Sequence, residues 1–416
     1  MPTMPTPDDV RTTSIADAAA YRQGPPLAEF ARLRSQAPVA WVPEPTRRLR
    51  SGSGFVEHTG TGFWAVTRHE TVVAASRQPT LFSSAARGAF LSDPKSWADL
   101  ERSRQLLIGM DPPEHGVLRR RIVSAMPTRA ALAQSIHDHA ASLVSAFVAE
   151  GGGDVVADVA AELPLLVLAD LLGVPSQDRH LFFEWSNNLV GFDDPDIGGN
   201  DVTTFTRTIA EAFGYARRLA NDRRRSPRDD FVSALVTGPE PLDESAFCHA
   251  WLLMVVAGNE TTRHLISGGI DLLLEHPRLA ERFVAGADVS KAVDEMLRWV
   301  TPIMQFRRTA TADTELEGQP IAEGDKVILY YIAANHDETV FDSPEVPDLA
   351  RDPNPHLSFG VGPHFCLGGH LARQEAVELF TALRPHVARL RRAGSGSRLA
   401  SNFMNGFKEL PVTLGR

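Results

Sequence analysis

The chain has few cysteines, few aromatic residues and no long apolar run. Two of its 416 residues are cysteines, Cys248 and Cys366, which do not make a disulfide framework and fit a reducing cytoplasm. Aromatic residues make up 7% of the chain, so an aromatic substrate is not indicated. The longest apolar stretch, 163–174, is interrupted by Asp170 and Gly173 and is too short to cross a bilayer.

Basic residues are also fewer than acidic residues. The chain has 42 Lys and Arg against 52 Asp and Glu, and its formal net charge of −10 predicts no nucleic-acid partner. The polar first 14 residues lack the apolar core of a signal peptide, and no membrane anchor is visible. No glycine-rich dinucleotide fingerprint follows a predicted strand, and the chain has no length for a reductase domain. We expect a cytoplasmic monomer.

Apolar periodicity predicts a mostly helical protein with a small strand-rich lobe made from both ends of the chain. The predicted helices include 27–34, 69–76, 129–150, 157–172, 178–190, 202–224 and 244–275, and the predicted strands are 39–42, 63–66, 314–317, 326–331 and 410–414. We expect a loosely held arm over 1–25 and a single domain over 26–416. Residues 82–110 read as a long irregular segment. Between the first two strands, Arg47, Arg48 and Arg50 read as part of a solvated loop.

The most distinctive stretch is 355–373, which surrounds Cys366 with glycines. Gly360 and Gly362 precede the thiol, and Gly368 follows it before an apolar helical pattern begins. Such a loop lets the backbone approach a flat ligand, and the nearby backbone N–H groups favour a thiolate. A lone thiolate is one of the few ways in which proteins hold haem iron. The alternative for this residue alone is a buried structural cysteine in a turn.

The spacing of Phe359, Gly362, His364, Cys366 and Gly368 closely resembles the haem-ligand loop of the cytochrome P450 superfamily. The resemblance extends from about residue 65 to 414 and is nearest to actinobacterial members that oxidise lipids, steroids and terpenoids. It implies the haem-thiolate fold, mainly α with a minor β lobe, with haem b as the cofactor and Cys366 as the metal ligand. The cofactor-binding residues that the resemblance implies are His115, Arg119, Arg308, Phe359, Gly360, Gly362, His364 and Cys366. Four of them match positions that bind the haem propionates: His115, Arg119, Arg308 and His364.

A polar run, 258–262, interrupts the apolar pattern of the helix predicted over 244–275. It resembles the family's oxygen-activation segment, which implies that Thr261 is the catalytic alcohol and Glu260 the acid that feeds a proton-carrying water chain. Read alone, Thr261 could simply donate a hydrogen bond to its own helix. Family members that consume peroxide often lack this pair, so its presence favours dioxygen and electrons.

Glu295 and Arg298 lie three residues apart on one predicted helix and can pair. They match the family's E-x-x-R motif, and Arg351 fits its usual third member. Such a cluster is structural: it holds the loop that carries the thiolate. By itself the E-x-x-R spacing carries no information, because surface pairs of this kind are common.

The implied reaction inserts one oxygen atom from dioxygen into a C–H bond of a hydrophobic small molecule that is lipid-, steroid- or terpenoid-like. Electrons would come from a separate ferredoxin or flavodoxin with its reductase. The alternatives are a haem-binding sensor or carrier without turnover, and a peroxide-driven peroxygenase. The candidate substrate-binding residues, each of which could equally be plain core, are Phe90, Leu91, Leu253, Val256, Ala257, Ile303, Met304 and Phe403.

Overall fold

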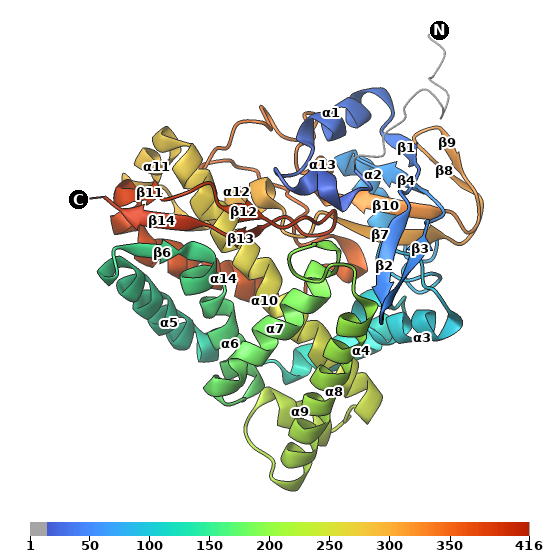
Figure 1. Cartoon of the computed structure of the whole chain (residues 1–416), viewed down its shortest axis with the longest axis horizontal. Helices are drawn as coiled ribbons and strands as arrows, with labels where there is room; N and C mark the ends of the chain where they lie inside the picture. The colour runs from blue at the N-terminus through green and yellow to red at the C-terminus, as the bar shows by residue number, and fades with distance from the viewer. Residues whose placement is uncertain (1–14, 416) are drawn as a thin grey trace.

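The computed structural model describes residues 15–415, and its architecture is mainly helical with a smaller sheet portion, as predicted (Figure 1). The helices are α1 (Leu27–Gln36), α2 (His69–Ser76), α3 (Trp97–Gln105), α4 (Glu114–Ala125), α5 (Arg129–Ala149), α6 (Glu162–Leu172), α7 (Arg179–Val190), α8 (Val202–Arg225), α9 (Phe231–Thr237), α10 (Glu244–Glu275), α11 (Pro277–Val284), α12 (Val289–Val300), α13 (Tyr331–Ala334) and α14 (Gly369–Leu383).

The main sheet joins strands from distant parts of the chain. Its order is β1 (Val39–Val42), β4 (Phe63–Val66), β10 (Lys326–Tyr330), β7 (Gln305–Ala310) and β5 (Phe82–Ser83). Only the β4–β10 pair is parallel. Every residue of β10 is buried, as expected for a central strand covered on both faces. This lobe lies at the upper right of Figure 1.

Four smaller strand groups complete the structure of residues 15–415. They are the ribbon β2 (Arg47–Ser51) with β3 (Gly54–His58), the pair β8 (Thr314–Leu316) with β9 (Gln319–Ile321), the pair β12 (Ser397–Arg398) with β13 (Phe407–Glu409), and a three-stranded sheet of β11 (Leu390–Arg392), β14 (Pro411–Leu414) and β6 (Gly152–Asp154).

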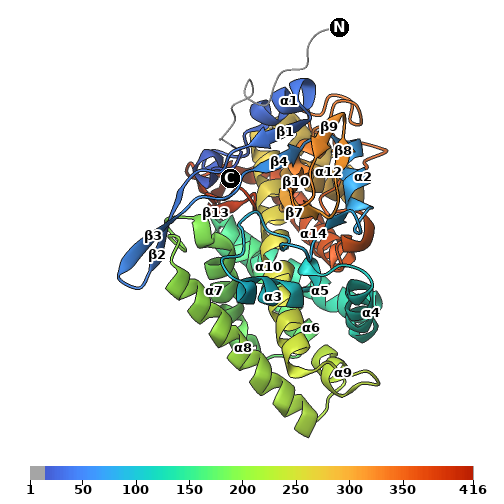
Figure 2. The same ribbon diagram turned by 90° about the vertical axis from the view of Figure 1, so that its right-hand side faces the viewer.

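Helix α10 runs through the middle of the helical part and organises the packing around it (Figures 1 and 2). It begins at Asp243, whose side chain accepts a hydrogen bond from the backbone N–H of Ala246 and so caps the helix. Helices α6, α7, α8, α12 and α14 all contact it. Because most of its residues are buried, a polar group in its centre must be bonded to protein or used.

Three expectations are corrected by packing that the sequence pattern did not show. Residues 15–25 are held rather than loose: Ile15 and Tyr21 are buried, and Asn402 donates a hydrogen bond to the carbonyl of Ala16. The rest of the expected arm, 1–14, lies outside the described residues. The segment 82–110 contains α3, which Ser96 caps. The expected loop around Arg47 is the β2–β3 ribbon.

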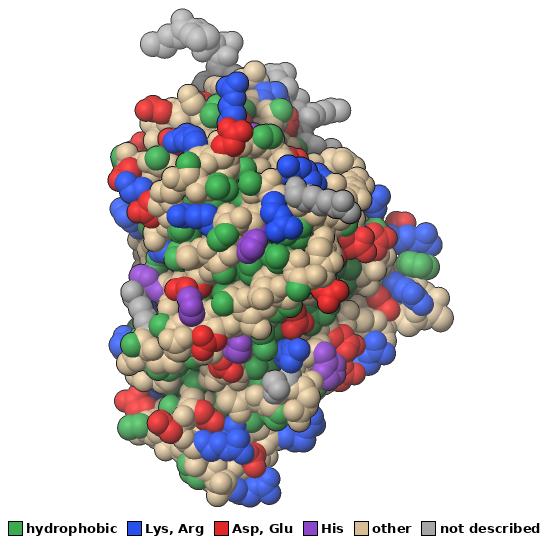
Figure 3. Space-filling view, turned by 90° about the vertical axis from the view of Figure 1, so that its left-hand side faces the viewer, with side chains coloured by type: hydrophobic (Ala, Val, Ile, Leu, Met, Phe, Trp, Pro, Cys, Tyr) green, Lys and Arg blue, Asp and Glu red, His purple; other side chains and the backbone are tan. Residues whose placement is uncertain are grey.

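None of the helices within residues 15–415 has the length and apolar character needed to cross a membrane. On the face shown in Figure 3, acidic, basic and apolar side chains are interspersed. Among the described residues, the large apolar side chains with the most exposed surface are Trp97, Val346, Val56 and Phe55.

Candidate functional site

The loop that precedes α14 presents Cys366 as predicted. The backbone N–H of Cys366 donates to the carbonyl of Phe359 over 2.8 Å, which closes the loop. Gly360 and Gly362 have φ values of 67° and 76°, in the left-handed region that favours glycine. A side chain at Gly362 would also meet the carbonyl oxygen of Ser76 at 2.8 Å. These glycines are therefore required by the turn.

The Cys366 thiol lies between opposing electrostatic influences. Burial among protein atoms raises its pKa, whereas hydrogen bonds from the backbone of Gly368 and Gly369 and the charge of Arg119 lower it. The residue nevertheless keeps an exposed surface, unlike the second free cysteine, Cys248, which is buried in the helical core. Of the two cysteines, Cys366 is therefore the one that a ligand can approach.

A group of nitrogen-bearing side chains lies beside the thiol. The rings of His115 and His364 are 4.4 Å apart between centroids. Burial, followed by the charges of Arg308, His115 and Arg119, lowers the pKa of His364 to about 2, and similar causes lower the pKa of His115. Both rings are therefore neutral at neutral pH. The structure brings together all four residues that the resemblance assigned to the propionates.

These four residues fit a haem with its two propionates. Arg308 donates to the carbonyl of Arg307, and among the described ion pairs neither Arg308 nor Arg119 has a carboxylate partner. Arg308 is buried, and buried cations normally have anionic partners. Arg307 is excluded from this group because it pairs with Asp93 over 2.8 Å. Two carboxylates placed here would meet this unsatisfied demand.

The centre of α10 holds its polar groups in two different surroundings. Glu260 is fully buried, accepts a hydrogen bond from Ser186 of α7 over 2.7 Å and forms an ion pair with Arg263. Burial raises the pKa of Glu260, and Arg263 and Ser186 oppose this shift. Thr261 keeps some exposed surface and donates to the carbonyl of Ala257 over 2.9 Å. This hydrogen bond to its own helix is also the bond expected if Thr261 has only a structural role.

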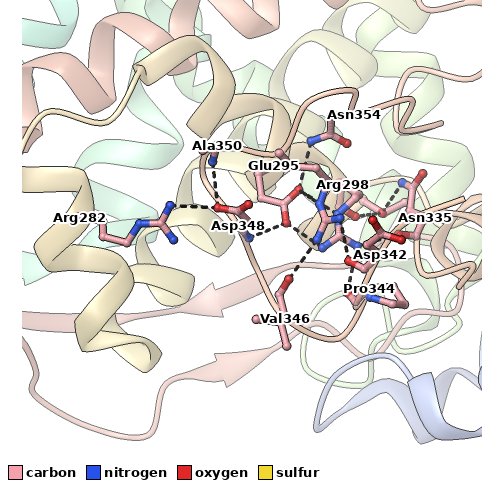
Figure 4. Close-up of polar contacts among 12 residues, drawn as sticks. Arg282, Glu295, Arg298, Asn335, Asp342, Pro344, Val346, Asp348, Ala350 and Asn354 are labelled. Atoms are coloured by element: carbon pink, nitrogen blue, oxygen red, sulfur yellow. Dashed lines mark hydrogen bonds and ion pairs between the residues drawn. The ribbon is translucent and has the colours of Figure 1, made fainter.

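Glu295, Arg298 and Arg351 form one buried cluster (Figure 4). Arg298 binds both carboxylate oxygens of Glu295 at 2.8 and 2.9 Å, and Arg351 donates to the same carboxylate over 3.1 Å. Arg298 also donates to the carbonyls of Asn335 and Pro344. The cluster therefore ties α12 to the segment that leads to the Cys366 loop.

The predicted substrate-binding residues divide into two groups. Phe90 and Phe403 lie 5.6 Å apart between ring centroids, and Phe306, which the sequence analysis missed, contacts both. Phe306 could have been found from the sequence because it lies two residues before Arg308, a predicted cofactor-binding residue. Ala257 keeps exposed surface, and Ile303 is partly buried and bridges to Met404. Met304 does not fit the prediction, because it is fully buried in the core beneath the sheet.

The other three predicted residues also pack against neighbouring side chains. Leu253 and Val256 are partly buried against the helical core around α10. Leu91 is buried in the same core as Met304, but it also lines a separate cavity near the N-terminal segment. Aromatic rings from three distant segments, Phe90, Phe306 and Phe403, therefore form the best-defined apolar wall in this region.

Comparisons with known proteins agree with this site. The model of the family described as cytochrome P450 matches residues 289–383, which include the Glu295 cluster and the Cys366 loop. A steroid C26-monooxygenase of Rhodococcus jostii is 38% identical over 96% of this chain and 84% of its own. The chain belongs to the cytochrome P450 family. A methyl-branched lipid omega-hydroxylase of Mycobacterium bovis is 39% identical over 92% of this P450 and 90% of its own length.

Solved structures show the same relationship. A Mycobacterium marinum cytochrome P450 in complex with pseudoionone superposes on this P450 with a TM-score of 0.84 and 36% identity, covering 93% of this chain and 94% of that one. The protein is a haem-thiolate monooxygenase that uses haem b and acts on hydrophobic substrates. The fold and the enzyme class predicted from the sequence are confirmed, and the reading as a carrier without turnover is set aside.

Proposed function

We propose that Cys366 would bind the haem iron through its thiolate in this enzyme. The observation that carries the proposal is the exposed thiol, held by a loop with two left-handed glycines, near Arg119 and Arg308, which have no carboxylate partner among the described ion pairs. His115, Arg119, Arg308 and His364 would bind the propionates, and Phe359, Gly360 and Gly362 would shape the loop beneath the ring. Bound haem supplies the iron centre at which dioxygen is activated, and a thiolate ligand favours cleavage of the O–O bond.

The protein's own contribution to the chemistry is proton supply from α10. We propose that Thr261 donates a proton from Oγ1 and that the Glu260 carboxyl replenishes it. Burial raises the pKa of Glu260, and this direction supports the role because it makes the carboxyl a better proton carrier than an exposed one. Since Ser186 and Arg263 hold Glu260 away from exposed surface, replenishment needs a rotation of the carboxyl or ordered water. The position of α7 is thereby linked to proton supply.

The substrate proposed is a steroid or a methyl-branched lipid, hydroxylated near the end of an alkyl chain. The names of the relatives support this class, and so does the apolar wall of Phe90, Phe306 and Phe403 with Ala257 and Ile303. Aromatic rings offer a large apolar contact surface, which suits a substrate of this class. Titration with a steroid and with a methyl-branched fatty acid, followed by haem absorbance, tests this class.

Electrons are proposed to come from an acidic ferredoxin or flavodoxin. Arg120 of α4 supports a docking place near the thiol: it is exposed, and it follows Arg119, whose charge acts on Cys366. Its neighbour Arg121 pairs with Glu240 and is less available.

We also propose that residues 26–416 act as one domain and that the protein is a cytoplasmic monomer. The two free thiols support the cytoplasmic location, because free thiols are usual in a reducing compartment.

Two cysteine variants test the proposal. Reduced protein with carbon monoxide should absorb at the position typical of thiolate-bound haem, and Cys366→Ala should abolish this band while folding is preserved. Cys248→Ala is the matched control, because Cys248 is buried in the helical core and its removal should leave the band unchanged. Loss of the band in Cys248→Ala but not in Cys366→Ala would overturn the assignment.

A further inference from the structure

A buried histidine without a hydrogen bond lies beside the Glu260 carboxyl. His264 follows Glu260 by one turn of α10, and its Nε2 lies 3.6 Å from Oε2 of Glu260. Both side chains are fully buried. Among the described residues, neither ring nitrogen of His264 has a hydrogen-bond partner, although a neutral imidazole carries one donor and one acceptor. Buried polar atoms are normally bonded, so the presence of this ring needs an explanation.

Other polar atoms around Glu260 are also incompletely bonded. Oδ1 of Asn259 and Nε of Arg263 are buried and have no partner among the described residues. Both side chains are nevertheless held by α7, because Asn259 donates to Ser186 over 2.8 Å and Arg263 donates to Asn187 over 2.8 Å. The surroundings of the carboxyl are therefore fixed in place but still offer open donors and acceptors.

A glycine near the end of the chain makes room for the His264 ring. Gly406 lies in the turn between β12 and β13, and a side chain at this position would collide with ring atoms of His264. The ring thus packs between α10 and the turn that also carries Phe403. A phenylalanine ring would serve this packing without burying unsatisfied nitrogens, so packing alone does not account for a histidine here.

Burial favours the neutral form of both His264 and Glu260. It lowers the pKa of His264 well below its ordinary value, and the charges of Arg263 and Arg398 lower it further. Burial raises the pKa of Glu260, whereas Arg263 and a hydrogen bond from Ser186 lower it. The charged side chains that act on this pair thus come from α10 and β12, and α7 adds a hydroxyl. A neutral imidazole therefore faces a carboxyl that burial inclines to bind a proton.

We propose that His264 is a positioning residue for proton supply, whose Nε2 accepts a hydrogen bond from the protonated carboxyl of Glu260. The inference rests on the proposed role of Glu260 and adds the partner of its protonated form. In the ionised form, Oε2 of Glu260 pairs with Arg263. When this carboxylate takes up a proton from water, its attraction to the guanidinium is lost. The new O–H then turns to the nearby nitrogen, which has no other partner among the described residues.

The proton later leaves Glu260 toward Thr261, and the carboxylate returns to Arg263. His264 keeps its own N–H throughout, so it neither gains nor loses a proton. Arg263 stays bonded to Asn187 while the carboxyl is turned away, which keeps its guanidinium ready for the return. His264 therefore holds the proton-loaded state, and Arg263 holds the unloaded one.

Infrared spectra of the haem-loaded enzyme test this contact, because the carbonyl stretch of a protonated carboxyl depends on the hydrogen bond that its O–H donates. Spectra are recorded as the pH is lowered, and the Glu260 band is the component that Glu260→Gln lacks. We expect His264→Phe to move this band to higher frequency and to lower its pH midpoint by about one unit, the equivalent of one hydrogen bond. The midpoint falls because loss of the acceptor destabilises the protonated form. Turnover should fall on the order of tenfold with KM unchanged.

Two polar variants separate the hydrogen bond from the packing. His264→Gln places an amide oxygen close to the position of Nε2 and should keep the wild-type band, whereas His264→Asn places it close to Nδ1 and should behave like His264→Phe. His249→Phe is the matched control on the same helix. Nδ1 of His249 already donates to the carbonyl of Ser245 over 2.8 Å, so its loss should not move the Glu260 band.

An unchanged Glu260 band in both His264→Phe and His264→Asn would overturn the contact. The lack of any Glu260 band over the pH range in which the enzyme stays folded would overturn it too, since the protonated form would then not exist. The relay itself is distinguished by turnover of Glu260→Gln. If the band shifts as expected but Glu260→Gln turns over at the wild-type rate, the contact with His264 stands and its role in proton supply is overturned.

Discussion

Glu260 and Thr261 are neighbours in α10, yet they meet different surroundings. The Glu260 carboxylate is bonded to Ser186 and Arg263 inside the protein, whereas the Thr261 hydroxyl lies where surface is still exposed. A mutation at each position therefore disturbs a different step. In the proposed relay, loss of the Thr261 hydroxyl would remove the final proton donor, and loss of the Glu260 carboxyl would remove its supply.

Thr261→Ala should bind haem and substrate, accept electrons and lose coupling. NADPH consumption with a surrogate reductase should continue while product falls and peroxide accumulates, because protons no longer arrive in time. Glu260→Gln should instead slow the whole cycle. General acid–base groups typically contribute about 10²–10⁴-fold, which sets the upper range for both effects.

The measurement for these two variants is product formed per NADPH consumed, together with peroxide. Thr261→Ser keeps a hydroxyl and should recover much of the coupling. If Thr261→Ala stays as coupled as the wild type, its hydroxyl serves only to bond Ala257 within the helix.

Single residues could be predicted where chemistry restricts the choice. Cys366 with its glycines, and the His115, Arg119, Arg308 and His364 group, could be named from the resemblance because each motif has a fixed spacing. The separate surroundings of Glu260 and Thr261 could not, since Ser186 comes from α7. Met304 was wrongly placed in the substrate wall, because an apolar residue looks the same in sequence whether it faces a ligand or the core.

At the scale of elements, the Glu295 cluster connects α12 to irregular chain. Its carboxylate accepts hydrogen bonds from Arg298, Arg351, Asn354 and the backbone of Asp348. The segment between α13 and the Cys366 loop has few regular elements, so these bonds supply much of its order. The cluster therefore acts on the haem loop through folding rather than through chemistry.

Glu295→Ala should yield little haem-loaded protein. Removing one partner of a buried charge cluster costs on the order of 3–5 kcal/mol, because the remaining guanidinium groups stay buried without their anion. The measurement is the free energy of unfolding in urea and the haem content after purification.

Glu101→Ala is the control for Glu295. Glu101 pairs with Arg104 at the same three-residue spacing over 2.7 Å, but on the exposed surface of α3. It should cost less than about 1 kcal/mol. A Glu295→Ala protein that is as stable and haem-loaded as Glu101→Ala would show that the cluster has another role.

Most long elements could be predicted because their apolar periodicity is continuous. Strands β1 and β4 and helix α2 have the predicted bounds, and α10 matches over 244–275. Helix α3 was missed because its exposed face is rich in charge and only Leu100 is buried. The β2–β3 ribbon was missed because its order comes from contacts with the distant 191–203 segment, which no local pattern reveals.

At the scale of the whole molecule, the formal net charge of −10 would repel an acidic electron donor unless basic groups gather where it docks. Arg120 is exposed on α4, whereas Arg278 is exposed on α11, and these two helices lie in different parts of the structure (Figure 1). Reversing either charge lowers the formal net charge by the same amount. Any difference between the two variants therefore reports location and not total charge.

Arg120→Glu should weaken reduction by an acidic ferredoxin, and Arg278→Glu should not. The rate of haem reduction at limiting ferredoxin should fall on the order of 10-fold in Arg120→Glu, because local charge steers the encounter. Raising the ionic strength from about 0.01 to 0.15 M shortens the Debye length from roughly 30 to 8 Å and should shrink the difference. Stopped-flow reduction of the ferric enzyme in the presence of carbon monoxide, followed as the carbon monoxide band appears, measures both effects. Equal losses in the two variants would show that the donor responds to overall charge, and no loss in Arg120→Glu would place its docking site away from α4.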